Sequence, residues 1–202
     1  MRLEINPKNP QQRLIDQVIN ILKNGGIIAY PTDTSYGIGC DMMNKKAVEK
    51  VLQFKKASKN QLVSFICPDL SEISRYAKVS NYAYKTMKRL LPGPYTFILE
   101  ASPLVPKIMV TKRKTTGIRV PDNAICKALV SALGNPIINT SATIAEGVYF
   151  DEASFLEKEL KHVLDLVIDG GPVPNQASSV VSLLDDTPEV FRKGSGNIDL
   201  FK

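Results

Sequence analysis

The stretch Ile27–Asp41 reads IIAYPTDTSYGIGCD, an apolar run followed by a run of short polar side chains. The apolar run predicts a buried strand, which Pro31 ends because proline cannot donate to a sheet ladder. The polar run Thr32–Tyr36 leads into Gly37 and Gly39. Hydroxyls donate and accept hydrogen bonds, and glycine lets a backbone approach closely, so this stretch suits a loop around a small polar ligand. A polar turn in a β-hairpin is an equally good interpretation.

Apolar periodicity along the rest of the chain predicts alternating helices and strands. Helices are expected at 11–23, 45–56, 82–91, 124–133 and 154–161. Strands are expected at 27–30, 62–66, 95–100, 116–120, 136–139, 164–168, 179–184 and 190–192. Because helices and strands alternate first and strands then follow one another, we expect an α/β fold with a single open twisted mixed sheet flanked by helices. No linker-like segment interrupts this pattern, so residues 1–202 are expected to form one domain.

The composition is that of an ordinary globular protein, with 44% hydrophobic and 23% charged residues. Lysine and arginine number 26 and the acidic residues 20, and the resulting charge of +6 favours polyanionic partners such as nucleotides or RNA. No apolar run approaches the roughly 20 residues that span a bilayer, and the first residues lack the apolar segment of a secretion signal. We therefore expect a cytoplasmic protein without a membrane partner. Its cysteines are expected to be buried free thiols: Cys40, Cys67 and Cys126.

Several catalytic mechanisms are excluded by the sequence. His162 is the only histidine and lies in a charged segment, so a Ser-His-Asp triad is not expected. The cysteines and the histidine lack zinc-ligand spacing. No Gly-x-x-x-x-Gly-Lys run is present that could form a P-loop. An enzyme with this sequence would therefore not depend on a histidine base.

Cations and hydroxyls remain as candidates for a functional site. Arg119 lies between Ile118 and Val120 in an apolar strand, and a buried arginine needs an anionic partner. That partner is either a carboxylate of the protein or a carboxylate or phosphate of a ligand. Two further polar runs adjoin strands, Asn139–Thr143 after one and Ser178–Ser179 before another. Ligands of open α/β sheets bind outside strand ends, so the three polar runs are expected to line one crevice.

These runs carry a resemblance to the YrdC/YciO family that extends from Gly25 to Gly196. It rests on residues 30–40, 92–97, 115–121, 139–142, 178–181 and 190–194. The resemblance implies a large basic concave crevice. The best characterised members of the family make threonylcarbamoyl-AMP from ATP, L-threonine and bicarbonate, and this product supplies the threonylcarbamoyl group later placed on adenosine in tRNA. A nucleotidyltransferase of this type is therefore expected.

The resemblance also implies roles for the matching residues. The L-threonine pocket would be formed by Thr34, Arg119, Asn139 and Ser178, with the arginine on the carboxylate. ATP would be held by Lys55, Thr115, Ser141 and Arg192. Mg²⁺ is expected with ATP, held largely by the phosphates and not by a metal site of the protein. The carbamate of threonine is itself the nucleophile, so positioning and charge neutralisation, above all by Lys55 and Arg119, are expected to supply the catalysis.

Two positions depart from the pattern of the active members. Lys55–Ala57 lacks the arginine of their Lys-x-Arg motif, and Ser141–Thr143 lacks the asparagine of their Ser-x-Asn motif. Losing one charge-assisted phosphate contact costs about 1.5–3 kcal/mol, which Lys56 or Lys59 could partly offset. Together with Pro92–Phe97, these changes resemble the YciO-like branch, so a weaker or diverted enzyme is expected. The C-terminal accessory domain of the long forms is not expected.

Two alternatives stay open. The chain could be a double-stranded RNA or tRNA-binding protein that has lost the synthase reaction, which the charge and the basic run Lys112–Lys114 favour. The absence of tryptophan weakens a stacking mode, so recognition of RNA shape would be the expected mode. The chain could instead be a ligase or transferase that acts on another amino acid or amine.

Overall fold

The computed structural model describes residues 1–57, 63–145, 148–150 and 152–201. Its helices are α1 (Gln12–Lys23), α2 (Lys45–Ala57), α3 (Leu70–Tyr76), α4 (Asn81–Leu90), α5 (Ala124–Leu133) and α6 (Ala153–Leu160). Its strands are β1 (Arg2–Glu4), β2 (Ile28–Tyr30), β3 (Gly37–Gly39), β4 (Ser64–Ile66), β5 (Ala77–Lys78), β6 (Tyr95–Ala101), β7 (Thr115–Arg119), β8 (Ile137–Ser141), β9 (Thr143–Ala145), β10 (Val148–Tyr149), β11 (Leu166–Asp169), β12 (Ser179–Ser182) and β13 (Glu189–Arg192). The helices expected from the sequence are all present, each within one residue of its predicted ends.

The main sheet is mixed and has the strand order β1-β11-β2-β3-β8-β4-β7-β6-β12-β13, with β5 beside β6. The parallel pairs are β1 with β11, β11 with β2, β4 with β7, and β6 with β12. The antiparallel pairs in this order are β2 with β3, β3 with β8, β4 with β8, β6 with β7, and β12 with β13. β9 and β10 form a separate hairpin. The open mixed sheet expected from the sequence is therefore confirmed.

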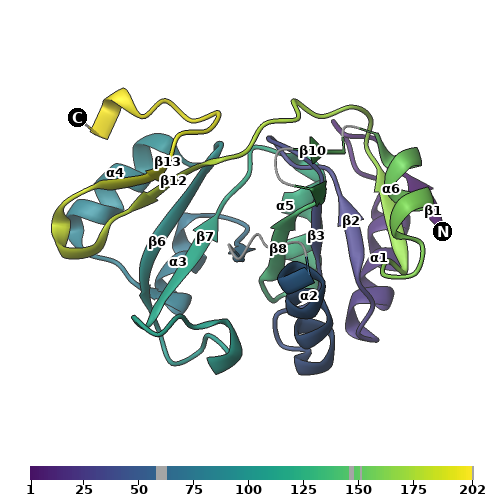
Figure 1. Cartoon of the computed structure of the whole chain (residues 1–202), viewed down its shortest axis with the longest axis horizontal. Helices are drawn as coiled ribbons and strands as arrows, with labels where there is room; N and C mark the ends of the chain where they lie inside the picture. Colours follow the sequence, from purple (N-terminus) through teal and green to yellow (C-terminus); the bar gives the residue numbers. More distant parts are fainter. Residues whose placement is uncertain (58–62, 146–147, 151, 202) are drawn as a thin grey trace.

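The sheet has two wings in Figure 1, with β6, β7, β12 and β13 on the left and β2, β3 and β8 on the right. The wings lean toward each other at the top of the view. The segment 170–178, drawn in yellow-green, passes across the top from β11 on the right to β12 on the left (Figure 1). Strands far apart in the sequence are thus brought together in one sheet.

β2 and β3 pair antiparallel, with Tyr30 opposite Gly37, so the polar run between them connects a β-hairpin. The hairpin interpretation of this run is confirmed. Thr32 Oγ1 organises the connection, because it accepts hydrogen bonds from the amides of Thr34 and Ser35 at 3.1 and 3.2 Å. It also donates to the Ser35 carbonyl at 2.6 Å. The polar run is therefore held in one conformation by its own first residue.

The sequence pattern did not predict β3, because two of its three residues are glycines and glycine is depleted in strands. β3 lies between β2 and β8 in the sheet. A Cβ on Gly39 would overlap the carbonyl oxygen of Ile138 on β8, so only glycine permits this pairing. The short elements α3, β1, β5, β9 and β10 were not predicted either.

The sheet carries a hydrophobic core on each face. Successive side chains of a strand point to opposite faces, and the neighbours Ile137 and Ile138 accordingly belong to different cores. One core packs α1 and α5 against the sheet through residues such as Leu22 and Leu129. The other contains strand residues such as Phe97 and Ile118. Each face of the sheet therefore carries a buried core.

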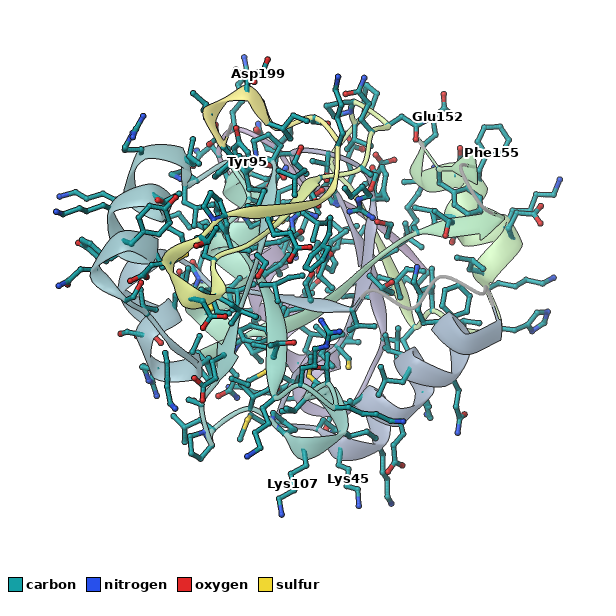
Figure 2. The ribbon with its side chains drawn as sticks, turned by 60° about the vertical axis from the view of Figure 1, so that its left-hand side comes forward. Lys45, Tyr95, Lys107, Glu152, Phe155 and Asp199 are labelled. Carbon is teal, nitrogen blue, oxygen red and sulfur yellow. The ribbon has the colours of Figure 1, made fainter. Side chains whose placement is uncertain are left out.

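The three cysteines agree with the expectation from the sequence. Cys40, Cys67 and Cys126 are buried and free, and burial raises the pKa of each thiol. Charged side chains such as Lys45 and Lys107 point away from the molecule (Figure 2). None of the helices in the described ranges has the length and apolar character needed to cross a membrane.

Candidate functional site

One cavity is lined by β4, β6, β7, β8 and β12, together with residues of α2 and β13. Seven of the eight residues predicted for substrate binding line it: Lys55, Thr115, Arg119, Asn139, Ser141, Ser178 and Arg192. The eighth, Thr34, contacts the cavity residue Arg119 through a hydrogen bond. The structure therefore brings all the predicted positions together, while the roles assigned to them stay predictions.

Strand periodicity explains how distant residues come to face one cavity. Residues two apart on a strand point to the same face. Thr115 and Arg119 lie at the two ends of β7, and Asn139 and Ser141 lie two apart on β8. Ile118, next to Arg119, points to the other face and belongs to the core. Alternation along β7 and β8 thus brings these predicted polar residues to one cavity.

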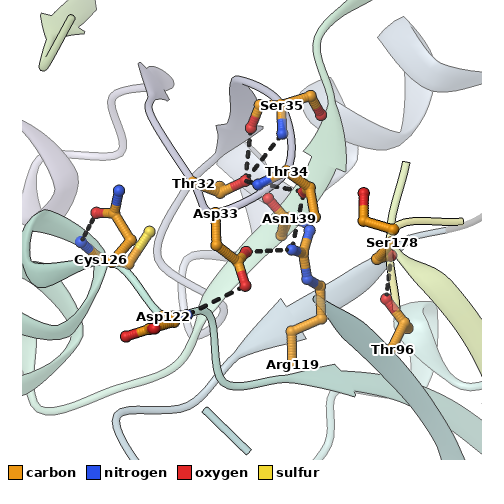
Figure 3. Close-up of polar contacts among 12 residues, drawn as sticks. Thr32, Asp33, Thr34, Ser35, Thr96, Arg119, Asp122, Cys126, Asn139 and Ser178 are labelled. Carbon is orange, nitrogen blue, oxygen red and sulfur yellow. Dashed lines mark hydrogen bonds and ion pairs between the residues drawn. The ribbon is translucent and has the colours of Figure 1, made fainter. Parts of the chain in front are cut away.

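Arg119 is nearly inaccessible, with 3% of its surface exposed. Its Nη2 donates to Asp33 Oδ1 at 2.8 Å and to Thr34 Oγ1 at 2.9 Å (Figure 3). Asp33 Oδ2 also accepts a hydrogen bond from the amide of Asp122, shortly after β7, at 3.1 Å (Figure 3). The sequence left open whether the anionic partner of Arg119 is a carboxylate of the protein or a ligand. The structure shows a protein carboxylate, that of Asp33, which sequence reasoning did not single out.

The guanidinium of Arg119 also has a donor that no described residue uses. Its Nε is buried and lacks a hydrogen-bond partner within the described ranges. A buried unpaired donor costs about 1–3 kcal/mol, and a ligand oxygen could remove that cost. A ligand acceptor thus fits beside the Asp33–Arg119 pair, so the two interpretations of the buried arginine are compatible.

Lys55 and Arg192 bring two more cations to the same cavity. Lys55 lies on α2 and is only 3% exposed. Burial, followed by repulsion from Arg192, lowers the pKa of Lys55 to about 8. Arg192 donates from Nε to the Ser178 carbonyl at 3.0 Å and from Nη2 to Ser178 Oγ at 3.2 Å. Two cations that repel each other across a cavity favour an anionic ligand there.

Thr96 and Thr111 are among the cavity hydroxyls that sequence reasoning missed. Thr96 Oγ1 lies 2.8 Å from Ser178 Oγ (Figure 3), and Thr111 Oγ1 lies 2.7 Å from Thr115 Oγ1. A signal for Thr96 was present, because it neighbours the core residue Phe97 on β6 and must point to the other face. Thr111 precedes a basic turn. No pattern in the neighbouring sequence indicates that its side chain contacts Thr115, four residues later.

The two residues that depart from the family pattern lie in different elements. Thr143 is buried at the start of β9. Ala57 ends α2. The side chain of Lys56 and all of Lys59, which were expected to offset the missing arginine, lie outside the described residues. That compensation stays a prediction.

Comparison with known proteins shows to which family the chain belongs. The sequence model of the Sua5_yciO_yrdC family, described as "Telomere recombination", matches residues 20–194. The chain belongs to this family. The match includes the β2–β3 hairpin and the predicted cavity residues, so the family expected from the sequence is confirmed.

Among curated members of the family, the Escherichia coli K12 protein named "Uncharacterized protein YciO" is 42% identical over 98% of this chain and 97% of its own length. The threonylcarbamoyl-AMP synthase of Bacillus subtilis is 32% identical over 95% of this chain, and the chain spans 55% of that protein. The chain is therefore more similar to YciO than to this synthase.

Solved structures of the family have the same fold. The crystal structure of E. coli YciO matches with a TM-score of 0.95 and 39% identity, covering 100% of this chain and 99% of that one. The crystal structure of P. abyssi Sua5 complexed with L-threonine matches with a TM-score of 0.88 and 22% identity, covering 99% of this chain and 59% of that one. The second likeness concerns the fold alone. The fold expected from the resemblance is thus confirmed.

Proposed function

We propose that the protein is an L-threonylcarbamoyl-AMP synthase, which converts ATP, L-threonine and bicarbonate into threonylcarbamoyl-AMP and diphosphate. One observation carries the proposal: a single cavity holds Arg119, whose Nε has no partner among the described residues, and also the cation pair of Lys55 and Arg192. The substrates bring matching anionic groups, the carboxylate of the amino acid and the triphosphate of ATP. The name of the B. subtilis relative supports this activity.

In this proposal L-threonine binds at the Arg119 end of the cavity. The unpaired Nε donates to the carboxylate, and the remaining polar groups of the ligand meet the side chains of Thr34, Asn139 and Ser178. Hydroxyls and amides can each donate and accept, which suits a ligand that carries an amine, a hydroxyl and a carboxylate. The P. abyssi relative was solved with L-threonine, which supports the same assignment.

ATP binds at the other cations. Lys55 and Arg192 neutralise phosphate charge, and the hydroxyls of Thr115 and Ser141 bond to the phosphates or the sugar. The described residues contain no group of three or more histidine, cysteine or acidic side chains that could hold a metal. The donor set therefore fits a Mg²⁺ ion that is held by the phosphates with hydroxyls such as Ser141 nearby. When bound, this ion would neutralise part of the phosphate charge.

The reaction needs no nucleophile from the protein. The amine of L-threonine adds to CO₂ derived from bicarbonate and forms a carbamate. A carbamate oxygen attacks the α-phosphorus, the bond to the bridging oxygen breaks, and diphosphate leaves with that electron pair. The residues of the cavity hold the two reactants in line and stabilise the developing charge. The product would supply the threonylcarbamoyl group for adenosine in tRNA.

We infer that the activity is weaker than that of members with both motifs. Ala57 and Thr143 remove one cationic and one amide contact from the nucleotide side. A charge-assisted contact contributes about 1.5–3 kcal/mol, which corresponds to roughly 10–150-fold in affinity. The loss is therefore expected in the KM for ATP more than in the KM for L-threonine.

Release of diphosphate tests this function. Purified protein with ATP and Mg²⁺ should release diphosphate only when both L-threonine and bicarbonate are present. Replacing L-threonine in turn by each of the other amino acids and by simple amines separates the synthase from a ligase of another substrate. The proposal fails if L-threonine supports no release, or if release does not depend on bicarbonate.

An RNA-binding function is the second candidate, because an exposed basic surface adjoins the cavity. Lys112, Arg113 and Lys114 are all exposed in the turn between the cavity residues Thr111 and Thr115. Binding of tRNA or double-stranded RNA through this turn should weaken steeply as salt rises. If Lys112→Ala/Lys114→Ala protein binds tRNA as well as the wild type does, or if binding is insensitive to salt, this candidate is wrong.

A further inference from the structure

Tyr30 on β2 reaches a cavity residue on β8, across the intervening strand β3. Its phenol donates a hydrogen bond to Asn139 Oδ1 at 2.9 Å, and the same hydroxyl lies 3.3 Å from the carbonyl oxygen of Ile138. Tyr30 is 1% exposed, and burial raises its pKa well above the ordinary value. The phenol therefore stays protonated and remains a donor throughout the physiological pH range.

Gly37 makes this contact across β3 possible. A Cβ at this position would overlap Asn139 Oδ1 and would lie 3.2 Å from Tyr30 Cζ. Any larger residue would therefore displace the amide of Asn139 or the ring of Tyr30. Gly37 on β3 thus allows the contact between Tyr30 on β2 and Asn139 on β8.

The contact also fixes which end of the Asn139 amide faces the cavity. A primary amide carries an acceptor oxygen on one side and a donor NH₂ group on the other. Because the oxygen is engaged by Tyr30, the NH₂ group is left to the cavity that Asn139 lines. Asn139 is only 4% exposed, and Oδ1 is the amide atom that Tyr30 engages. An acceptor oxygen of a ligand could bond to the NH₂ group.

We propose that Tyr30 is a positioning residue that holds the Asn139 amide with its NH₂ group toward the cavity, so that the site binds a carboxylate or carbamate oxygen of its amino-acid substrate there. This inference rests on the proposed synthase function and adds the residue that sets the polarity of the pocket. Without the phenol, the amide could rotate and present its oxygen instead. An anionic ligand oxygen would then meet an acceptor in place of a donor.

The first test needs no ligand. The side-chain NH₂ signals of Asn139 are assigned in an amide NMR spectrum by their absence from Asn139→Ala protein. Tyr30→Phe should shift these signals, because the amide loses its bond to the phenol. The matched control is Tyr36→Phe, which removes another buried phenol from the same hairpin, one that donates to the Gly171 carbonyl at 2.9 Å. This control should leave the Asn139 signals in place.

The second test measures binding of L-threonine and of ATP by calorimetry. Tyr30→Phe should weaken L-threonine about 3–10-fold, the usual worth of one net hydrogen bond. Its affinity for ATP should not change. In an Asn139→Ala background, the same change at Tyr30 should have no further effect on L-threonine, because the tyrosine acts only through that amide. A purely structural role would weaken L-threonine in both backgrounds.

These arms separate the inference from the function on which it rests. If the wild type binds no L-threonine, the proposed function fails, and the ligand-free signals of Asn139 still decide whether Tyr30 positions the amide. Signals unmoved by Tyr30→Phe would overturn the inference. So would equal losses of L-threonine affinity in Tyr30→Phe and Tyr36→Phe, or a Tyr30 effect that persists without Asn139.

Discussion

Asp33 and Arg119 form a buried ion pair, with Oδ1 and Nη2 2.8 Å apart and side chains 9% and 4% exposed. The pair joins the loop between β2 and β3 to the end of β7, across 86 residues of sequence. Its second carboxylate oxygen holds the amide of Asp122. The ion pair therefore holds the loop against the cavity and orients Arg119.

Replacing Arg119 with alanine should abolish L-threonine binding and also destabilise the fold. The variant leaves the carboxylate of Asp33 buried without its cation, which typically costs about 3–5 kcal/mol in the free energy of unfolding. Denaturant unfolding followed by circular dichroism measures the second effect, and calorimetry measures the first.

The double variant Asp33→Asn/Arg119→Ala is the control for this prediction. Removing the buried charge should restore most of the lost stability, while L-threonine binding should stay absent. A double variant as unstable as the single one would show that the ion pair is not the cause. Retained L-threonine binding in Arg119→Ala protein would remove Arg119 from the substrate site.

Nucleotide binding should weaken as the pH rises through about 8, the lowered pKa of Lys55. The ammonium form is the one that attracts phosphate, and it predominates below this pKa and is lost above it. Binding of the anion favours the protonated form, so ATP should bind with uptake of a proton near pH 8. Above this pH, the affinity should fall by about tenfold per pH unit until the pKa of the complex is reached.

Lys55→Met should remove this pH dependence and weaken ATP at neutral pH. Lys45→Met is the matched control, because Lys45 lies on the same helix with a side chain 81% exposed. It should keep the wild-type profile. An unchanged profile in Lys55→Met protein would assign the titration to another group.

Thr96→Val should loosen Ser178, because it removes the hydroxyl that lies 2.8 Å from Ser178 Oγ. We expect a loss of about 1 kcal/mol in the free energy of unfolding and a several-fold weaker L-threonine affinity. Thr140→Val is the contrast, since Thr140 Oγ1 is buried without a partner among the described residues. Removing that hydroxyl should leave stability unchanged or raise it. Equal destabilisation by the two variants would contradict the account of Thr96.

Two glycines of β3 should respond differently to alanine. A Cβ on Gly39 meets the backbone oxygen of Ile138, which cannot move without breaking the strand pairing, so Gly39→Ala should lose the native fold. A Cβ on Gly37 meets the side-chain oxygen of Asn139, which can rotate. Gly37→Ala should therefore stay folded by circular dichroism and lose L-threonine affinity. Comparable unfolding of both variants would be the contrary result.

The sequence predicted the helices and the mixed sheet because their apolar patterns are long enough to show a period. α1, for example, places Ile15, Val18, Ile19 and Leu22 on one buried face. β3 could not be predicted in the same way, because its glycines are required by the close approach of β8 and not by any local preference. The packing of the neighbouring strand decides which residue is allowed at such a position.

The candidate site, like the fold, could be predicted where a local sequence pattern marks its residues. Polar runs next to strands, such as those holding Thr34 and Asn139, stand out against apolar surroundings. The partners Asp33 and Tyr30 lie 86 and 109 residues from the groups they hold. No local pattern reports a contact of that separation, so these residues emerge only when the sheet brings the strands together.

The most direct test of the central claim is mass spectrometry of the product formed from ATP, L-threonine and ¹³C-labelled bicarbonate with Mg²⁺. The account predicts a nucleotide product with the mass of threonylcarbamoyl-AMP that carries the label from bicarbonate, and Arg119→Ala/Asp33→Asn protein should not form it. If the wild type yields no labelled acyl-adenylate with L-threonine, the protein is not a threonylcarbamoyl-AMP synthase.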